Sequence, residues 1–496
     1  MFKLIINFFK LKMNESKPNV SEKINDLAPA FHTVSPDVRL TNQPTQTINS
    51  NEIRVTINPP NFMDTIRTII NRPTIFGTSF IITHVCLGNF AIFSLAQKTK
   101  SFGLAWIIIF CVLVGIINYW SIMRGFFASI KLKDTNYSEL TEKYLGKNAR
   151  RILNLIIMIY SFLYMMYLVG LTFPLIGRIV KIISYNKQYQ SYDTFLKEKW
   201  GVGFIKYIFF ICVGFCFYII TVFKFIKLRF ISFYRIITFT FCILFLIVQC
   251  PSYYKHYKNE IYNKNDKNTY PNWTDLSQAF TAKMEFFKGL SILFASYTCI
   301  PFMFPIFEQF KIQENPLKKT RTSVFFGTLL LTTFTIISII CSYLINPYSP
   351  EEFIFFRENK NHDIDVFLII TNFILVICII LTVPRYYLML KINFKILFFK
   401  NKTKLLEKLN NIFTFIFCFG SAIASIYFDG YLSYLSYIGG FFSVFINYLF
   451  PILIYVNSSE KKFKYWINII NIILAVILCI IGIIGGISTL VDDIKK

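Results

Sequence analysis

The chain has 496 residues, of which 54% are hydrophobic, 18% aromatic and only 16% charged. A soluble chain of this length would form two or three domains with about one quarter of their residues charged. The mean hydropathy of +0.51 is also far above that of a soluble protein. These values exclude a soluble protein and predict an all-α polytopic membrane protein.

Eleven apolar runs of about 17 to 28 residues follow one another from residue 74 onward. Each is long enough to cross about 30 Å of hydrocarbon as a helix. We therefore expect a transmembrane domain at 74–490, with a short C-terminal tail at 491–496. The expected spans 1 to 11 are 74–96, 103–129, 152–180, 203–223, 231–250, 286–307, 323–345, 366–390, 412–428, 434–455 and 466–489.

Residues 1–73 are expected to form a disordered cytosolic tail. Most of it, at 14–61, is rich in Ser, Thr, Asn and Pro and has no apolar periodicity. Residues 2–12 are apolar but end in lysines, and no small-residue cleavage pattern follows, so we do not expect a signal peptide. They form either a short amphipathic helix on the membrane surface or a patch without function.

The net charge of +25 would suggest nucleic acid as a partner of a soluble protein. Here the basic residues crowd alternate loops instead, so we expect the lipid bilayer and no nucleic acid as partner. The Lys/Arg bias places the N-terminus and the loops after even-numbered spans in the cytosol. The loop between spans 5 and 6 then lies outside or in a lumen, where Asn272-Trp273-Thr274 is a candidate glycosylation site.

No catalytic constellation is present in the sequence, so we do not expect an enzyme. The four histidines are scattered, and there is no P-loop, GxSxG or HExxH motif. The eleven cysteines lie inside or at the ends of spans and form no metal-type cluster. We therefore expect no metal and no cofactor, and any transport would be coupled to an ion gradient or not coupled at all.

Two spans contain residues that disfavour a helix. Span 1 has Gly88-Asn89 at its centre, and span 6 has Pro301 after a small and polar stretch at 294–299. Such breaks free backbone groups at membrane depth, which is tolerated where they line a cavity. Paired breaks five spans apart are typical of the substrate site of secondary transporters built from inverted repeats. The alternative is a kinked, closely packed helix pair without a ligand.

Short motifs along the chain resemble those of the amino acid/auxin permease family in order and spacing. They are Asn136-Tyr137-Ser138-Glu139-Leu140 with Gly146 and Arg150 or Arg151 ("SYxEL…xxGxxxR"), Lys227-Leu228-Arg229-Phe230-Ile231-Ser232 ("LRxxS"), Pro305-Ile306-Phe307-Glu308 with Glu314-Asn315-Pro316-Leu317-Lys318-Lys319 ("PIxxEMxNPxK"), Pro384-Arg385 ("P(L/R)R"), and Asp429 through Gly439-Gly440 to Pro451 ("D…xxxGxxxxxxxxFxxP").

This resemblance covers about residues 75–490 and implies the LeuT-type fold, with two inverted repeats of five helices and one further helix. It also implies amino-acid transport by alternating access, coupled to protons or, in some branches, to sodium. The stretch from His84 to Asn89 is similar to the "HxxxGN" of the proton-assisted branch, where the histidine is implicated in proton coupling. A pKa of about 6.5 suits that role. A neutral His84 bonded to a carbonyl is the alternative.

The charges of an amino acid suggest where it would bind. Its carboxylate would meet free N–H groups at a half-helix N-terminus, and its ammonium would meet carbonyls released in span 6. A tyrosine in a span is also a common packing residue. The candidate substrate residues are Leu87, Gly88, Asn89 and Ala91 in span 1, Phe294, Ser296, Tyr297 and Thr298 in span 6, Tyr164 or Tyr167 in span 3, and Thr371 or Asn372 in span 8. After Asn89 the sequence departs from the family's "GxGxLxLP", so substrate details do not transfer.

We therefore expect a secondary active transporter of amino acids, with proton coupling favoured and sodium coupling as the alternative. The expected location is the plasma membrane or a vacuolar or lysosomal membrane. A different class is an amino acid sensor that signals through the N-terminal tail with little flux. A structural or lipid-moving membrane protein is a third class.

Overall fold

The computed structural model describes most of the chain beyond residue 89. The chain divides into two units, Met1–Arg72 and Pro73–Lys496, and every described residue belongs to the second. The expected N-terminal tail lies outside the described residues, as do His84, Leu87, Gly88, Asn89 and Asn272. The described residues are 90–99, 103–132, 136–185, 188, 191–223, 228–256, 284–304, 316–345, 353–357, 365–398, 409–427, 431–459 and 466–495.

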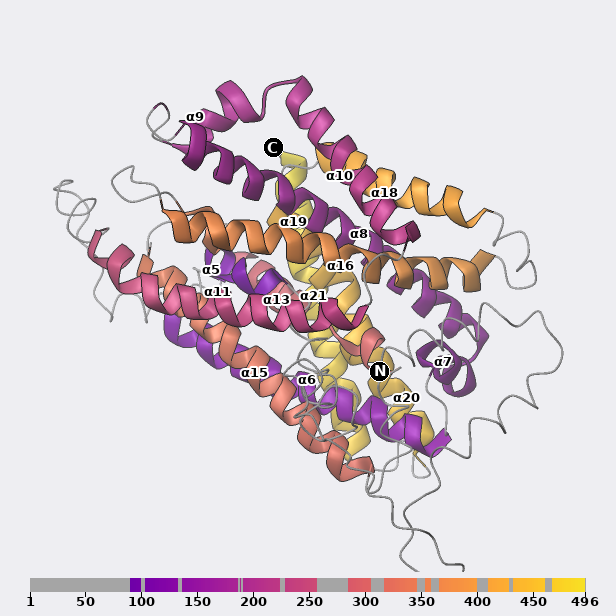
Figure 1. Cartoon of the computed structure of the whole chain (residues 1–496). Coiled ribbons are helices and arrows are strands. Elements are labelled where there is room, and N and C mark those ends of the chain that lie inside the picture. Colours follow the sequence, from indigo (N-terminus) through magenta and orange to yellow (C-terminus); the bar gives the residue numbers. More distant parts are fainter. Residues whose placement is uncertain are drawn as a thin grey trace, which may run out of the picture. The chain divides into compact units, whose positions relative to one another are not determined.

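Within these residues, ten helices are long and apolar enough to cross a membrane, and they coincide with expected spans 2 to 11. Of expected span 1, only the end is described, as a 3-10 helix, η2 (Phe90–Phe93), and the short α5 (Leu95–Thr99). The helices of spans 2 to 9 are α6 (Leu104–Leu132), α8 (Lys147–Val180), α10 (Phe204–Phe223), α11 (Leu228–His256), α13 (Met284–Ser296), α15 (Pro316–Ile345), α16 (Val366–Phe398) and α18 (Asn410–Tyr427) (Figure 1).

Span 10 is a composite of four helical segments. The α-helices α19 (Tyr431–Tyr437) and α20 (Phe450–Ser458) enclose two π-helical stretches, η9 (Ile438–Ser443) and η10 (Phe445–Leu449). Span 11 is α21 (Trp466–Lys495). Because a π-helix has one extra residue per turn, it leaves some backbone carbonyls without their usual partner.

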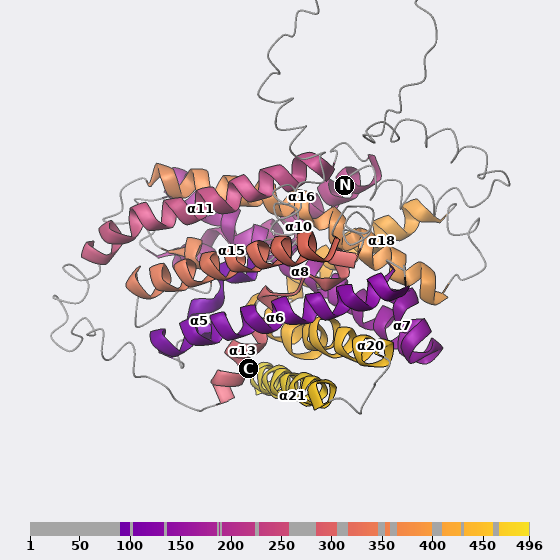
Figure 2. The ribbon, with the colours of Figure 1, turned by 90° about the horizontal axis from the view of Figure 1, so that it is seen from below.

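Helices five spans apart in the sequence pack against each other. The most extensive contact in the molecule joins α8 to α16, and α10 packs likewise on α18 and α6 on α15 (Figure 2). Contacts between the two repeats also occur in matching pairs. Span 5 (α11) packs on span 7 (α15), and the corresponding span 10 (α20) packs on span 2 (α6). Because five is odd, the two members of each pair cross the membrane in opposite directions. These contacts fit two inverted repeats followed by α21.

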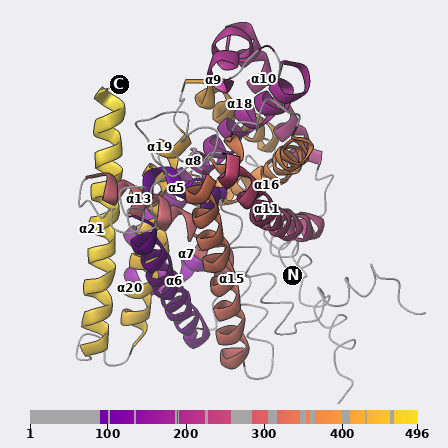
Figure 3. The same cartoon turned by 90° about the vertical axis from the view of Figure 1, so that its left-hand side faces the viewer.

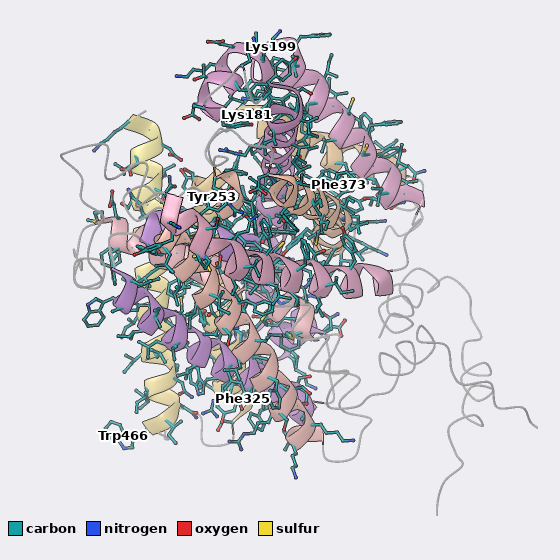
Figure 4. The ribbon with its side chains drawn as sticks, turned by 60° about the vertical axis from the view of Figure 1, so that its left-hand side comes forward. Lys181, Lys199, Tyr253, Phe325, Phe373 and Trp466 are labelled. Atoms are coloured by element: carbon teal, nitrogen blue, oxygen red, sulfur yellow. The ribbon has the colours of Figure 1, made fainter. Side chains whose placement is uncertain are left out.

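The outward-facing side chains are those of a protein surrounded by lipid. On α10 and α21, Phe204 is 77% exposed, Trp466 79% and Ile494 75%. Figure 4 shows Trp466 projecting from the end of α21 away from the other helices. A soluble protein rarely exposes contiguous apolar surface of this extent, because it would associate or aggregate. In a bilayer the same side chains contact acyl chains.

The loop between α6 and α8 forms the short helix α7 (Tyr137–Leu145). The Asn136 side chain caps its first turn by accepting a hydrogen bond from the Ser138 N–H at 3.1 Å. Gly146 ends it with a φ of 90°, a conformation that favours glycine. The Arg150 Nε then donates to the Ser138 hydroxyl at 3.1 Å. These motif residues therefore fasten α7 to the start of α8.

Backbones approach closely where α13 meets η9 and α21 (Figure 3). A Cβ on Gly439 would lie 1.6 Å from the Ser291 carbonyl oxygen, and one on Gly485 would lie 2.2 Å from the Phe287 carbonyl oxygen. The Ser291 hydroxyl also donates to the Gly482 carbonyl at 3.1 Å. Small residues are required here because the helices touch through their backbones.

We expect Gly439→Ala to destabilise the protein by at least about 2 kcal/mol, because a backbone carbonyl cannot yield to the new methyl group. The matched control is Gly420→Ala in α18, where no atom lies within 4 Å of the added Cβ. Alanine is the better helix former, so the control should be neutral or stabilising by up to about 1 kcal/mol. Thermal unfolding of both purified variants in detergent measures the difference. Equal midpoints would contradict the packing described here.

Candidate functional site

Span 6 is interrupted inside the bundle. The helix α13 ends at Ser296, residues 297–299 are not helical, and the helix resumes at Ile300. Pro301 is a direct cause, because its missing N–H would otherwise donate to the carbonyl of Tyr297, four residues earlier. The break falls within the stretch that the sequence predicted to be unwound.

One side chain, that of Asn447, forms hydrogen bonds with the backbone on both sides of the break. The Asn447 Nδ2 donates to the Tyr297 carbonyl at 2.9 Å, and the Ile300 N–H donates to the Asn447 Oδ1 at 3.3 Å. These are the carbonyl freed by Pro301 and an amide whose usual helical acceptor lies across the break. Asn447 is fully buried in η10, and the sequence analysis missed it. The available signal was a lone amide inside an apolar span.

The π-helical stretch that carries Asn447 is held by two further donors. The Tyr137 hydroxyl of α7 donates to the Ile446 carbonyl at 2.8 Å, and the Ser121 hydroxyl donates to the Asn447 carbonyl. The Tyr137 ring also stacks on Phe304, in the helix after the break, with centroids 4.5 Å apart. Burial raises the pKa of the Tyr137 phenol well above its ordinary value, so it remains a donor at physiological pH.

The other predicted residues of span 6 are engaged within the protein. The Thr298 hydroxyl donates to the Phe294 carbonyl at 2.9 Å, and the Ser296 hydroxyl donates to the Ile292 carbonyl at 2.9 Å. The Tyr297 side chain bonds to a different helix: its hydroxyl donates to the Cys111 carbonyl of α6 at 3.2 Å. What this segment offers a ligand is therefore its backbone, since each carbonyl has a second lone pair.

Span 1 also departs from an α-helix where it is described. Residues 90–93 form the 3-10 helix η2, and the chain bends at Ser94, whose N–H donates to the Ala91 carbonyl at 3.0 Å. Ala91 is fully buried. The remaining candidate residues of this span lie outside the described residues.

A cluster of buried tyrosines faces the second half of the broken span. The ring of Tyr164, near the middle of α8, stacks on Tyr386 of α16 with centroids 4.3 Å apart. Tyr386 also meets Phe302 edge to face at 5.4 Å. One turn along α8, the Tyr167 hydroxyl lies beside Ser94 at the end of η2. The structure therefore brings predicted Tyr164 and Tyr167 between spans 1, 6 and 8, and adds Tyr386.

Thr371 and Asn372 lie elsewhere on α16. Both are fully buried, but they precede Tyr386 by about four helical turns, or about 21 Å. The Thr371 hydroxyl donates within its own helix to the Phe367 carbonyl at 2.8 Å. The Asn372 amide has no hydrogen-bond partner among the described residues. The structure does not bring this pair to the tyrosine cluster.

Aromatic side chains close the bundle on the side opposite α7. Residues 353–357, between α15 and α16, are buried, and Phe353 and Phe355 pack against Phe93 with centroids 5.8 and 5.1 Å apart. Phe93 in turn meets Phe239 of α11 at 5.2 Å. Arg357 lies over the Tyr253 ring at 4.4 Å and anchors the segment to α11. Packed rings thus lie on both sides of the break in span 6.

Within the described part of the chain, no group of three or more His, Cys, Asp or Glu residues is placed to hold a metal ion. The groups around the break are backbone carbonyls, tyrosine rings and hydroxyls, the amide of Asn447, and the guanidinium of Arg385, which lies over the Phe302 ring at 3.6 Å. This set suits a small polar molecule that hydrogen-bonds to the protein, including one with a carboxylate.

Asn447→Leu keeps the side-chain size but leaves the Tyr297 carbonyl and the Ile300 N–H without this partner. We expect a loss of about 2 to 5 kcal/mol in the free energy of unfolding, because each buried unsatisfied group costs about 1 to 3 kcal/mol. The control is Asn457→Leu in α20, since Asn457 is half-buried and donates only to the Leu453 carbonyl of its own helix. Thermal unfolding in detergent should show the difference, and equal losses would contradict a bridging role.

Comparison with known proteins agrees with this architecture. The family model described as "Transmembrane amino acid transporter protein" matches residues 72–489. No curated protein is significantly similar in sequence. Among solved structures, the inward-facing conformation of Mhp1 matches with a TM-score of 0.52 and 12% identity, over 85% of this chain and 89% of that chain.

A manganese transporter of Eremococcus coleocola, solved with an aromatic bis-isothiourea compound, also matches, with a TM-score of 0.47 and 10% identity over 89% of this chain and 91% of that chain. At such identities the likeness to Mhp1 concerns the fold alone. The family match covers nearly all of the transmembrane unit, from the end of the N-terminal tail into α21. The chain belongs to the family of transmembrane amino acid transporter proteins.

Proposed function

We propose that the chain is a secondary active transporter that moves amino acids across a membrane by alternating access, with proton coupling. The observation that carries the proposal is the interruption of span 6 at residues 297–299, held open by Asn447 beside the tyrosine cluster. Backbone groups released at membrane depth are tolerated where they are buried in protein or line a cavity, and a carbonyl that already accepts one hydrogen bond keeps a second lone pair for a ligand. The family match and the pairing of helices five spans apart support the same function.

The proposed substrate site lies between spans 1, 3 and 6. The ammonium of the amino acid would donate hydrogen bonds to carbonyls around Phe294 to Thr298, and its carboxylate would accept from N–H groups of Leu87, Gly88, Asn89 and Ala91. Tyr164 and Tyr167 would form a side wall. Gly88 would let the backbone approach the ligand closely. Thr371 and Asn372, which were expected in the cavity wall, lie about 21 Å along α16 from Tyr386 and are not included in this wall.

Alternating access requires that the two sides of the site open in turn. On one side, Tyr137 joins α7 to Phe304 and to the Ile446 carbonyl. On the other side, Phe353 and Phe355 pack against Phe93. We propose that transport opens one of these contacts while the other stays closed, by movement of one repeat against the other.

The proposed topology follows the charge of the loops. The N-terminal tail would be cytosolic, the C-terminus outside or luminal, and Asn272 accessible to glycosylation. The membrane would be the plasma membrane or that of a vacuole or lysosome. The coupling ion would be the proton, with sodium as the alternative, and no metal or organic cofactor would be needed.

The direct test is counterflow by the purified protein in liposomes, with a panel of labelled amino acids and with or without a pH gradient. Saturable counterflow of at least one amino acid is the expected result. Binding without exchange would instead indicate a sensor that signals through the N-terminal tail. Neither binding nor exchange across the whole panel would contradict the proposed function.

His84→Ala tests the coupling ion. A histidine protonated on the more acidic side and deprotonated in the cytosol would carry a proton with the substrate, since its ordinary pKa is about 6.5. We expect the variant to lose accumulation driven by a pH gradient but to keep exchange at symmetric pH. Unchanged accumulation with the same pH dependence would move the coupling to another group or to sodium.

A further inference from the structure

Two arginines inside the bundle have buried guanidinium nitrogens without a hydrogen-bond partner among the described residues. Arg235 of α11 is 0% exposed, and this holds for all three of its guanidinium nitrogens. Arg385 of α16 is half-buried, and it holds for its two terminal nitrogens. The two cations lie close enough to repel each other. No carboxylate of the described chain pairs with either.

The buried Lys288 differs from these arginines in having a counter-ion. It lies on α13 and is paired with Asp492 of α21. A buried cation without a counter-ion is costly inside a membrane protein. Such a residue usually pairs with a residue of opposite charge, or it marks the path of a charged ligand. Neither Arg235 nor Arg385 has a counter-ion among the described residues, so a negatively charged ligand would be stabilised beside them.

The arginine pair lies at the site proposed above. The Arg385 guanidinium lies over the ring of Phe302 at 3.6 Å. Tyr160, Tyr386 and Cys299, the last residue of the break in span 6, lie near it. Arg235 in turn lies near Tyr164 and Tyr386. Four helices, α8, α11, α13 with its continuation, and α16, thus place both cations beside the tyrosine cluster.

The chemistry that fits two guanidinium groups is a carboxylate. Their planar N–H forks match its two oxygens, and the tyrosine hydroxyls nearby add hydrogen-bond donors. A neutral zwitterionic amino acid brings no net charge to this site, whereas aspartate or glutamate brings one net negative charge. Only the acidic amino acid offsets part of the excess positive charge.

We infer that Arg235 and Arg385 bind the side-chain carboxylate of the substrate, so that the chain selects acidic amino acids over their amides. This inference rests on the proposed amino-acid transport and names its substrate class. Glutamate and glutamine test this selectivity, because they differ little in size but only glutamate carries the side-chain charge that the arginines would bind.

The experiment is competition for counterflow in liposomes, supplemented by thermal unfolding of the full-length protein in detergent. Unlabelled glutamate should compete at a concentration at least about 30-fold lower than glutamine, given the strength of charge-assisted hydrogen bonds. In Arg235→Gln this preference should fall to about 3-fold or less. Arg235→Lys, which keeps the charge but not the fork, should give an intermediate preference. The control is Arg321→Gln at the exposed start of α15, where the preference should be unchanged.

Thermal unfolding without ligand separates a ligand-binding role from a structural one. Removing an unpaired buried charge should leave the midpoint of Arg235→Gln unchanged or raise it. A clear fall of the midpoint would mean that Arg235 is paired within the protein, and the inference would be wrong. Stabilisation by chloride through Arg235, with no displacement by glutamate, would likewise overturn the carboxylate assignment.

The outcomes for the two proposals are distinguishable. If neutral amino acids exchange while glutamate and glutamine compete equally, the acidic selectivity fails and amino-acid transport stands. If no amino acid exchanges, glutarate, a dicarboxylate without the ammonium, becomes the probe in thermal unfolding. If glutarate stabilises the unmodified protein but not Arg235→Gln, the carboxylate site is supported although amino-acid transport fails. Absence of stabilisation would overturn both.

Discussion

A broken helix in a membrane has to find partners for the backbone groups that it releases, and the site depends on how span 6 does so. Pro301 frees the Tyr297 carbonyl, and the interruption frees the Ile300 N–H. Asn447 bonds to both through one amide. The π-helical turn that carries Asn447 releases carbonyls in turn, which accept hydrogen bonds from Tyr137 and Ser121. Each departure from the helix is thus satisfied by the next element.

These bonds also connect the break to the surface of the bundle. Tyr137 lies on α7 and bonds to η10, and its ring stacks on Phe304 a short way beyond the break. Asn447, one residue after Ile446, then bonds to Tyr297. A shift of α7 would therefore act on both halves of span 6 through short, rigid links. The glycine contacts of Gly439 and Gly485 restrain the first half of span 6, so movement is expected in the second.

The sequence predicted the spans well because length and hydropathy are local properties, and all ten described spans coincide with expected ones. It also predicted the break, because Pro301 acts on the turn next to it. It missed Asn447, whose partner Tyr297 is 150 residues away, and Tyr386, whose stacking on Tyr164 arises only when α16 meets α8.

Thr371 and Asn372 were chosen as polar residues of the correct span, but their position along the membrane normal depends on where α16 begins and how it packs. Arg235 lies within expected span 5, where an ionisable residue is itself a signal that the sequence analysis did not use; its lack of a partner is visible only in the fold.

Fixed charge in the site bears on proton coupling. Arginine does not lose its proton in proteins, so Arg235 and Arg385 cannot carry the coupled proton themselves. Their two positive charges would oppose protonation of any histidine in the same site, unless a ligand supplies negative charge. An acidic substrate does so, and it would make protonation easier when it binds. By reciprocity, protonation would strengthen substrate binding by the same factor. A site with two permanent cations is therefore best suited to load an anion and a proton together, and to release them together where protons are scarce.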